Sequence, residues 1–337
     1  MASRSDFGHN TKASEVAAAF AGQIKGRVIA VTGIAKAGLG SATALAFAQG
    51  EPSLLILISR TQTKLDEVAA EIAAIKPNVN VKTVQVDLLS HDSVRRAADA
   101  IKALTPRIDV LVNNAALTLY ERKHSSDGIE YQLAANHLGP FLLTNLLQDR
   151  FLEAAKTAPA GATRIVNVSS EAHRVSPFRF HDWNCEQKPV PEDETDSLEN
   201  WPAVFRKSND GYNGFVAYGQ SKTANILFSV GLNKRLAEKG VVSYSLHPGA
   251  IATELGREMT GELKDALADL LKRANQKPSN EEGSSTTLVA ALDPALNDIK
   301  GVYLDDCQLA KPEPYAVDLE KAEKLWALSE ELVKQKF

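Results

Sequence analysis

Short apolar runs alternate with longer amphipathic stretches from residue 28 onward. Each run is rich in Val, Ile and Leu, and its apolar residues are continuous rather than alternating with polar ones. Strands that are covered on both faces of a sheet have this composition. The pattern predicts seven strands, at Val28–Thr32, Leu54–Ser59, Val81–Val86, Val110–Asn113, Ile165–Ser169, Val241–Leu246 and Gly301–Leu304.

Amphipathic stretches of helical length separate these runs, at Ser41–Gln49, Gln62–Ile75, Ser93–Leu104 and Tyr218–Lys239. Gly240 follows the last of them, where a glycine commonly ends a helix. Repeated strand–helix alternation predicts an α/β fold of the Rossmann type, with a doubly wound parallel sheet of about seven strands and helices on both faces. We expect a single domain over residues 1–337.

Three segments depart from this alternation. Residues 1–26 form an N-terminal extension, and residues 250–283 contain leucines at helical spacing from Leu263 to Leu271. Residues 175–215 are too long for an ordinary connection and combine surface acids with aromatic residues that need a packing partner. The insert and the leucine-bearing helix are therefore expected to form a lid over a substrate pocket, with an oligomer contact as the alternative. The aromatic residues in question are Phe178, Phe180, Trp183 and Trp201.

Composition narrows the function classes. The chain has 44% hydrophobic and 24% charged residues, a net charge of −4 and a pI near 6.0. No basic surface for nucleic acid is indicated, and no apolar run reaches the roughly 18 residues of a membrane span. Cys185 and Cys307 lack both disulfide and metal-ligand spacing, so no metal is expected. The N-terminus is unlike a secretory signal, which favours the cytoplasm. Composition does not decide between a monomer and a homo-oligomer.

A glycine-rich turn joins the first predicted strand to the first predicted helix. Gly33, Gly38 and Gly40 stand where a chain must turn tightly and let its backbone approach a pyrophosphate, with Lys36 and Leu39 between them. The following helix offers free N–H groups and a partial positive charge to phosphates. The position of the turn between strand and helix makes dinucleotide binding the best reading.

The end of the second predicted strand indicates which dinucleotide. A site for NAD usually has an acid there, which holds the ribose 2′-hydroxyl. Here the chain reads Ser59-Arg60-Thr61, and Arg60, with Lys36 from the glycine turn, can hold a 2′-phosphate instead. NADP(H) is therefore the expected cofactor, unless both cations are only solvated surface charges.

Tyr218 and Lys222 lie four residues apart, on one face of a predicted helix. A phenol is a poor acid–base catalyst at neutral pH, and a neighbouring ammonium lowers its pKa. The pair alone is common by chance, and a hydroxyl must also hold the substrate oxygen.

Several motifs in order make the chain resemble the short-chain dehydrogenase/reductase family over nearly its whole length. After the glycine turn come Asp87-Leu88, Asn113-Asn114-Ala115-Ala116, Asn136, Ser170, Tyr218 with Lys222, and His247-Pro248-Gly249. The stretches at 136–141, 168–173 and 325–330 further resemble its retinol-dehydrogenase-like branch, including fungal members.

The resemblance implies a role for each matching residue. Tyr218 would be the general acid, or the base in oxidation. Lys222 would hold the nicotinamide ribose and lower the pKa of Tyr218. Ser170 would bind the substrate oxygen, and Asn136 would bend its helix around a water that passes protons to Lys222. The implied cofactor contacts are Gly33, Lys36, Gly38, Leu39, Gly40, Arg60, Asp87, Leu88, Asn113, Asn114, Pro248, Gly249 and Thr253.

Three departures from the family pattern affect the substrate more than the chemistry. Four residues separate Gly33 from Gly38 instead of three, Ala116 replaces a glycine, and the stretch from Ser170 to Tyr218 is unusually long. We expect an NADP(H)-dependent carbonyl reductase or alcohol dehydrogenase acting on a medium-sized, largely apolar molecule, such as a secondary-metabolite intermediate. An epimerase or dehydratase using the same pair is the alternative. A non-catalytic nucleotide-binding regulator is a third reading, although it would not need Ser170, Tyr218 and Lys222.

Overall fold

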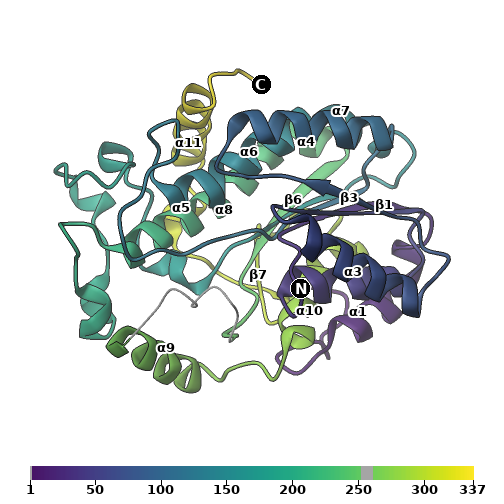
Figure 1. Ribbon diagram of the computed structural model, residues 1–337, viewed down its shortest axis with the longest axis horizontal. Helices are drawn as coiled ribbons and strands as arrows, with labels where there is room; N and C mark the ends of the chain where they lie inside the picture. Colours follow the sequence, from purple (N-terminus) through teal and green to yellow (C-terminus); the bar gives the residue numbers. More distant parts are fainter. Residues whose placement is uncertain (1, 252–260) are drawn as a thin grey trace.

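The computed structural model describes residues 2–251 and 261–337 (Figure 1). Its centre is a sheet in the order β3-β2-β1-β4-β5-β6-β7-β8. Strands β1 to β7 pair in parallel, and β8 pairs with β7 in the antiparallel sense. The strands are β1 (Val28–Thr32), β2 (Leu54–Ser59), β3 (Val81–Gln85), β4 (Val110–Asn113), β5 (Thr163–Val168), β6 (Val241–Leu246), β7 (Tyr303–Asp305) and β8 (Gln308–Leu309).

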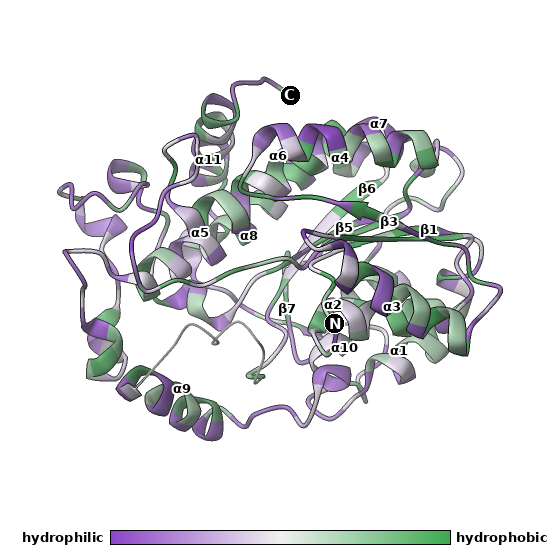
Figure 2. Cartoon of the chain, viewed as in Figure 1, coloured by the Kyte–Doolittle hydropathy of each residue, from purple (hydrophilic) through white to green (hydrophobic). Residues whose placement is uncertain are grey.

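Helices cover both faces of this sheet, as Figure 1 shows. One face carries α1 (Ala13–Ala19), α2 (Leu39–Gln49), α3 (Gln62–Ile75) and α10 (Asn280–Leu292). The other carries α4 (His91–Leu104), α6 (Gly139–Leu146), α7 (Gln148–Ala155), α8 (Gly214–Leu236) and α11 (Leu319–Leu332). Each face has its own buried cluster, and apolar colour is concentrated on the strands and on the helix sides turned toward them (Figure 2). Burial on both faces explains why the strands read as continuous apolar runs.

The predicted Rossmann-type fold is confirmed, with small differences at its edges. The sheet has an eighth strand, because a tight turn after β7 folds the chain back on itself. Asp306 and Cys307 form that turn with φ of 42° and 65°. A two-residue strand has no hydrophobic period that the sequence could reveal. Helix α8 begins at Gly214, one turn earlier than predicted, because the Asn213 side chain accepts hydrogen bonds from the Phe215 and Val216 amides. Gly240, with φ of 83°, closes the helical segment as expected.

The topology decides where chemistry can occur. Strands β1 and β4 are neighbours in the sheet, and the chain leaves them in opposite directions across it. Ligands of open α/β sheets bind at such a switch point, beyond the carboxyl ends of the strands. The glycine turn, Asn114, Ser170 and His247 follow the carboxyl ends of β1, β4, β5 and β6.

The N-terminal extension lies against the face that carries α10. Helix α1 contacts α10 and α2. The Gln308 amide donates to the carbonyls of Arg4 and Phe7, and Ser14 bonds Glu281. These bonds connect the extension to both β8 and α10.

The insert is built from short 3-10 turns and divides into two parts. Its first half docks on the core: the Arg179 amide donates to Gln220 of α8, and Asp193 pairs with Lys321 of α11. Its second half packs on α9 (Gly261–Arg273), the predicted amphipathic helix. Residues 252–260, between β6 and α9, lie outside the described part of the chain.

Candidate active site

Helix α8 presents Tyr218 and Lys222 on one face, both buried, with 9% and 2% of their surfaces exposed. The Lys222 ammonium nitrogen lies 5.5 Å from the centroid of the Tyr218 ring. It donates to the carbonyl of Val168, the last residue of β5, at 2.9 Å. The lysine is thus fixed between its helix and the end of the neighbouring strand.

Ser170 stands just past β5, facing the same helix. Its hydroxyl is near enough to the Tyr218 phenol to influence the pKa of that group, and it accepts from the Ala172 amide at 3.1 Å. The adjacent Ser169 turns the other way, donating to the Lys222 carbonyl at 2.7 Å. The structure therefore brings Ser170, Tyr218 and Lys222 together, and it assigns Ser169 to holding the helix against the strand.

Asn136 lies in a π-helical turn, Ala134–Leu138. Such turns widen a helix and leave its backbone carbonyls open to other partners. The Asn136 side chain is fully engaged: it accepts from the Leu117 amide at 2.8 Å and donates to the Leu117 carbonyl and to Ser221. Its backbone carbonyl also faces α8, where it accepts from Asn225 at 2.7 Å.

Burial dominates the protonation of the pair. It raises the pKa of the Tyr218 phenol, and the nearby Ser170 hydroxyl opposes that rise. It also lowers the pKa of Lys222 to about 7. The expected lowering of the Tyr218 pKa by Lys222 is not seen in this structure, because desolvation disfavours the charged form of both groups. At neutral pH Tyr218 is accordingly a proton donor.

The three histidines near the site are not acid–base groups at neutral pH. Burial lowers the pKa of His137 to about 3 and that of His247 to about 4. It also lowers the pKa of His173, whose ring bonds the Ser170 carbonyl at 2.8 Å and the Glu313 amide at 3.2 Å. His173 and His247 support the segment that follows β5, whereas His137 bonds Ser329 of α11 in the core.

The glycine turn packs closely against the residues around it. A Cβ on Gly33 would lie 2.7 Å from the Cα of Ala115, and one on Gly40 would lie 2.5 Å from the Gly33 carbonyl oxygen. Gly33 also has a φ of 77°, which side-chain-bearing residues rarely adopt. Gly38 precedes α2, and Leu39 is held by a bond from Ser284 of α10 to its carbonyl. The turn therefore exposes backbone, and the first amides of α2 have no intrahelical partner.

Two basic residues lie near this turn. Lys36 is exposed within it, and Arg60 is exposed just past the end of β2. Arg60 borders a cavity of about 510 Å³ along the free edge of β3. Arg96 of α4 and Asp87 line the same cavity. Leu88, the next residue, is buried against Gly139 of α6.

The two asparagines after β4 face opposite ways. Asn113 is buried and donates to Thr144 and to Asn167, at 3.1 and 2.9 Å. Asn114 instead donates to the carbonyls of Thr32 and Gly33, which fixes the glycine turn to β4. This geometry does not support the expected adenosine contact by Asn113, because side chains alternate in direction along a strand.

The segment after β6 carries Pro248 and Gly249, both half-buried. Gly249 has a φ of 93°, and a Cβ there would lie 2.3 Å from the Lys277 side chain. Lys277 is buried and donates to the His9 carbonyl at 3.0 Å, while pairing with Asp306. The N-terminal extension thus supports this turn from behind. Thr253, the last expected cofactor contact, lies outside the described residues.

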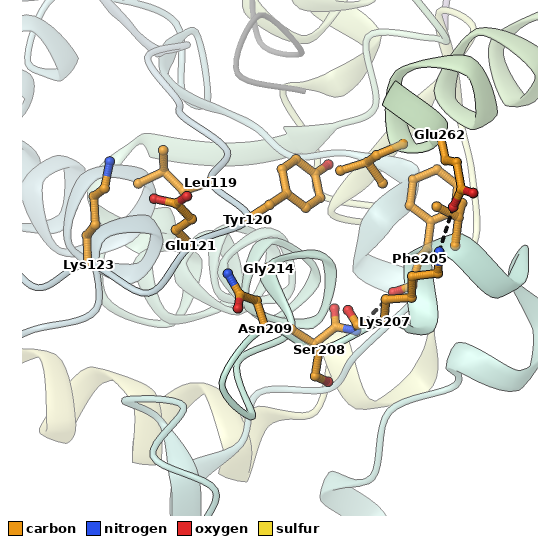
Figure 3. Close-up of a pocket in the computed structure, with 13 residues that line it drawn as sticks. Leu119, Tyr120, Glu121, Lys123, Phe205, Lys207, Ser208, Asn209, Gly214 and Glu262 are labelled. Atoms are coloured by element: carbon orange, nitrogen blue, oxygen red, sulfur yellow. Dashed lines mark hydrogen bonds and ion pairs between the residues drawn. The ribbon is translucent and has the colours of Figure 1, made fainter. Parts of the chain in front are cut away.

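A second cavity, of about 490 Å³, opens beside the N-terminus of α8 (Figure 3). Tyr120 extends across it toward Phe205 of the insert, and an ion pair between Lys207 and Glu262 joins the insert to α9 at its rim (Figure 3). Gly214, in its lining, is one helical turn from Tyr218. Tyr120 lies in a loop without hydrophobic periodicity, so the sequence analysis did not single it out.

The insert contributes to this region only in part. Trp201 and Phe205 pack with Tyr218 and with the leucines of α9. Phe178, Phe180 and Trp183 pack instead against the core cluster on the α8 and α11 face. The expectation that all these aromatics line one pocket is therefore wrong for the first half of the insert. That half is held by hydrogen bonds to α8, which turn its aromatic side chains toward the core.

Two further observations concern residues 2–251 and 261–337. No helix in these ranges is both long and apolar enough to cross a membrane. No group of three His, Cys, Asp or Glu side chains there could hold a metal ion.

Known proteins resemble this chain in sequence, and solved structures resemble it in fold. The family model for short chain dehydrogenases matches residues 27–182. Oxidoreductase fscI of Fusarium equiseti is 38% identical over 72% of this chain and 94% of its own length. Retinol dehydrogenase 12 of Bos taurus is 34% identical over 92% of this chain and 87% of its own. An uncharacterised protein from Mycobacterium paratuberculosis has a solved structure with a TM-score of 0.64 and 29% identity, covering 93% of this chain and 96% of that one.

Proposed function

The chain belongs to the short-chain dehydrogenase family as a retinol-dehydrogenase-like oxidoreductase, and on that premise we propose that it is an NADP(H)-dependent carbonyl reductase. Its substrate is a medium-sized, largely apolar aldehyde or ketone, of the kind found among secondary-metabolite intermediates. The observation that carries the proposal is that a buried Tyr218 lies next to both the Lys222 ammonium and the Ser170 side chain. A nucleotide-binding regulator needs no such arrangement.

The glycine turn fits a nicotinamide dinucleotide. Gly33 and Gly40 let the turn pack closely on β4 and on itself, where side chains would collide with Ala115 and with the Gly33 carbonyl. The first backbone N–H groups of α2 have no acceptor within the helix and can donate to phosphate oxygens. Pro248 and Gly249 would lie against the nicotinamide, and Asp87, Leu88 and Asn114 near the adenosine.

The reacting groups act on a single oxygen. The bound cofactor supplies a hydride to the carbonyl carbon. Tyr218 donates its phenolic proton to the carbonyl oxygen while Ser170 holds that oxygen by a hydrogen bond. Lys222 holds the nicotinamide ribose, and the Asn136 turn supports the lysine. Because burial raises the pKa of Tyr218, the phenol stays protonated at neutral pH and can serve as the proton donor in reduction.

The cavity beside Tyr218 supports the substrate assignment. Its lining combines the apolar residues Leu119, Tyr120, Val204, Phe205 and Leu263 with charged and amide side chains. A volume of about 490 Å³ suits a medium-sized ligand. The cytoplasmic location expected from the sequence stays a prediction.

One experiment tests the function directly. NADPH absorbance is followed while the protein is offered aliphatic aldehydes, aryl ketones and ring ketones, each with a control lacking the carbonyl. We expect stoichiometric loss of NADPH and formation of alcohol with at least one class. Conversion of a substrate without net loss of NADPH would replace the reductase by the epimerase or dehydratase alternative.

The cofactor preference makes a separate prediction. Arg60→Asp should weaken NADPH binding by about tenfold or more and leave NADH binding unchanged or stronger, because a carboxylate repels a 2′-phosphate and accepts from a 2′-hydroxyl. Dissociation constants come from the quenching of intrinsic fluorescence by each cofactor. Arg96→Asp makes the same charge change at the same cavity from α4 and is the matched control. Equal effects of the two variants would show that only the overall positive charge of the cavity matters. Equal affinity of the parent protein for NADH and NADPH would refute the preference for NADPH.

The substrate wall makes another prediction. Phe205→Leu should change the KM for the preferred carbonyl by about threefold or more, because Phe205 lines the cavity and packs near Tyr218. Phe180→Leu, the same change in the core-facing half of the insert, should leave KM unchanged. Both variants should keep the parental affinity for NADPH. The wall assignment fails if the two variants have the same KM as the parent.

A further inference from the structure

Lys222 has three N–H donors, and two of them have protein acceptors in the described structure. One is the Val168 carbonyl at 2.9 Å, and the other is the side-chain oxygen of Asn225 at 3.3 Å. Asn225 lies three residues further along α8, on the same side of the helix. One donor of the ammonium is left for the cofactor site.

The other end of the Asn225 amide also has a partner. Its nitrogen donates to the backbone carbonyl of Asn136 at 2.7 Å, in the π-helical turn. A primary amide has both a donor and an acceptor, so one side chain joins the ammonium to that carbonyl. Asn225 is 4% exposed, and its own carbonyl accepts from Ser245 of β6 at 3.2 Å.

A buried asparagine in the middle of a helix is costly unless its amide is satisfied. Here both halves are satisfied, and each partner belongs to the site. The Asn136 turn is itself fixed by Leu117 and Ser221. The bridge therefore connects Lys222 to a rigid anchor outside its own helix.

We propose that Asn225 is a positioning residue, whose amide fixes the Lys222 ammonium to the Asn136 carbonyl and so sets where the lysine meets the cofactor. The proposal rests on the proposed function. An amide linking two fixed groups orients the ammonium but does not pass protons on as a water does.

Other charges do not account for the state of Lys222. Within the described residues, the Tyr218 ring is the nearby titratable group, with its centroid 5.5 Å from the Lys222 ammonium nitrogen. The lowering of the Lys222 pKa comes from burial alone. Five ionisable side chains on the elements packed around α8 have partners other than Lys222. These are His137 with Ser329, Glu171 with Arg174, His173 with Glu313, Tyr315 with His173, and Glu323 with Arg235.

The test compares Asn225→Ala with Asn233→Ala. Asn233 lies two turns further along α8 and also uses both ends of its amide, donating to the Ser243 carbonyl and accepting from the Ser243 amide. Its loss removes similar hydrogen bonds away from Lys222. The first readout is the pKa of Lys222 in the cofactor-free protein, followed by NMR of lysines labelled with carbon-13 at Cε and assigned with Lys222→Met. The second is the pH profile of kcat for alcohol oxidation.

Asn225→Ala should lower the pKa of Lys222 by half a unit or more, because the ammonium loses an acceptor. Because the lysine is then charged less often and is held less firmly where it meets the cofactor, the pH profile of kcat should shift, and kcat at pH 7 should fall about tenfold with KM changed less than twofold. Asn233→Ala should change neither readout, although it lowers the melting temperature comparably.

The same Lys222 pKa and kcat profile in Asn225→Ala as in Asn233→Ala would overturn the proposal. If Asn225→Ala does not fold, Asn225→Ser decides by the same NMR titration, because its shorter hydroxyl cannot reach both partners. The NMR arm needs no substrate. A shifted Lys222 pKa in a protein that turns over no carbonyl would therefore refute the function and keep the positioning role.

Discussion

Tyr218→Phe is expected to lower kcat for carbonyl reduction by about 10²–10⁴-fold, the usual contribution of a general acid. The substitution keeps the ring, which packs with Val216 and Phe215, and removes only the transferable proton. NADPH affinity should stay within about twofold of the parent, so the loss falls on turnover. Single-turnover kinetics with saturating NADPH measure it directly.

Tyr212→Phe is the matched control, because it removes another buried phenol from the same region. The Tyr212 hydroxyl donates to the buried Glu130 carboxylate at 2.8 Å and accepts from Gln132. Its loss should cost about 1–3 kcal/mol of stability, since it leaves buried polar groups short of partners. Turnover should remain within a few-fold of the parent. If Tyr218→Phe keeps turnover similar to that of Tyr212→Phe, another group is the acid.

Much of this site could be predicted, because chemistry restricts which residues can do the work. A tight phosphate-binding turn needs glycine, and a proton donor near an ammonium needs the Tyr218 and Lys222 spacing. The order of these motifs along parallel strands then predicts that they meet at one edge of the sheet. The strands could also be predicted from the sequence, because burial on both faces of the sheet leaves continuous apolar runs.

Other features have weaker signals in the sequence. The directions of Phe180 and Phe205 within the insert depend on hydrogen bonds to α8 and contacts with α9, which follow no period. The pKa of Tyr218 depends on how completely the site is desolvated, and a motif does not encode that. Asn225 did carry a signal, because a polar amide within a buried helix demands partners. Only the structure identifies those partners as Lys222 and Asn136.

Lys222→Met is the second variant for which we expect a large effect, and it should separate function from stability. Methionine keeps most of the buried stem and removes the ammonium, so kcat should fall by about 10²-fold or more and NADPH should bind about tenfold more weakly. Lys234→Met, which makes the same change at a lysine distant from the site, is the control. Fluorescence titration gives the affinity, and stopped-flow absorbance gives the turnover.

Stability should change in the opposite direction. A buried ammonium without a carboxylate partner costs free energy, so its removal should raise the melting temperature near neutral pH. Burial lowers the pKa of Lys222 to about 7 in the folded protein, while the unfolded chain keeps the ordinary value of 10.5. Between these values the unfolded state binds more protons, and the contribution of Lys222 to the free energy of unfolding rises with pH. Lys222→Met lacks that rise, so its advantage over the parent should be greatest below pH 7 and should shrink toward pH 10. A variant that loses turnover and stability together at every pH would instead indicate that Lys222 mainly holds α8 to β5 through the Val168 carbonyl.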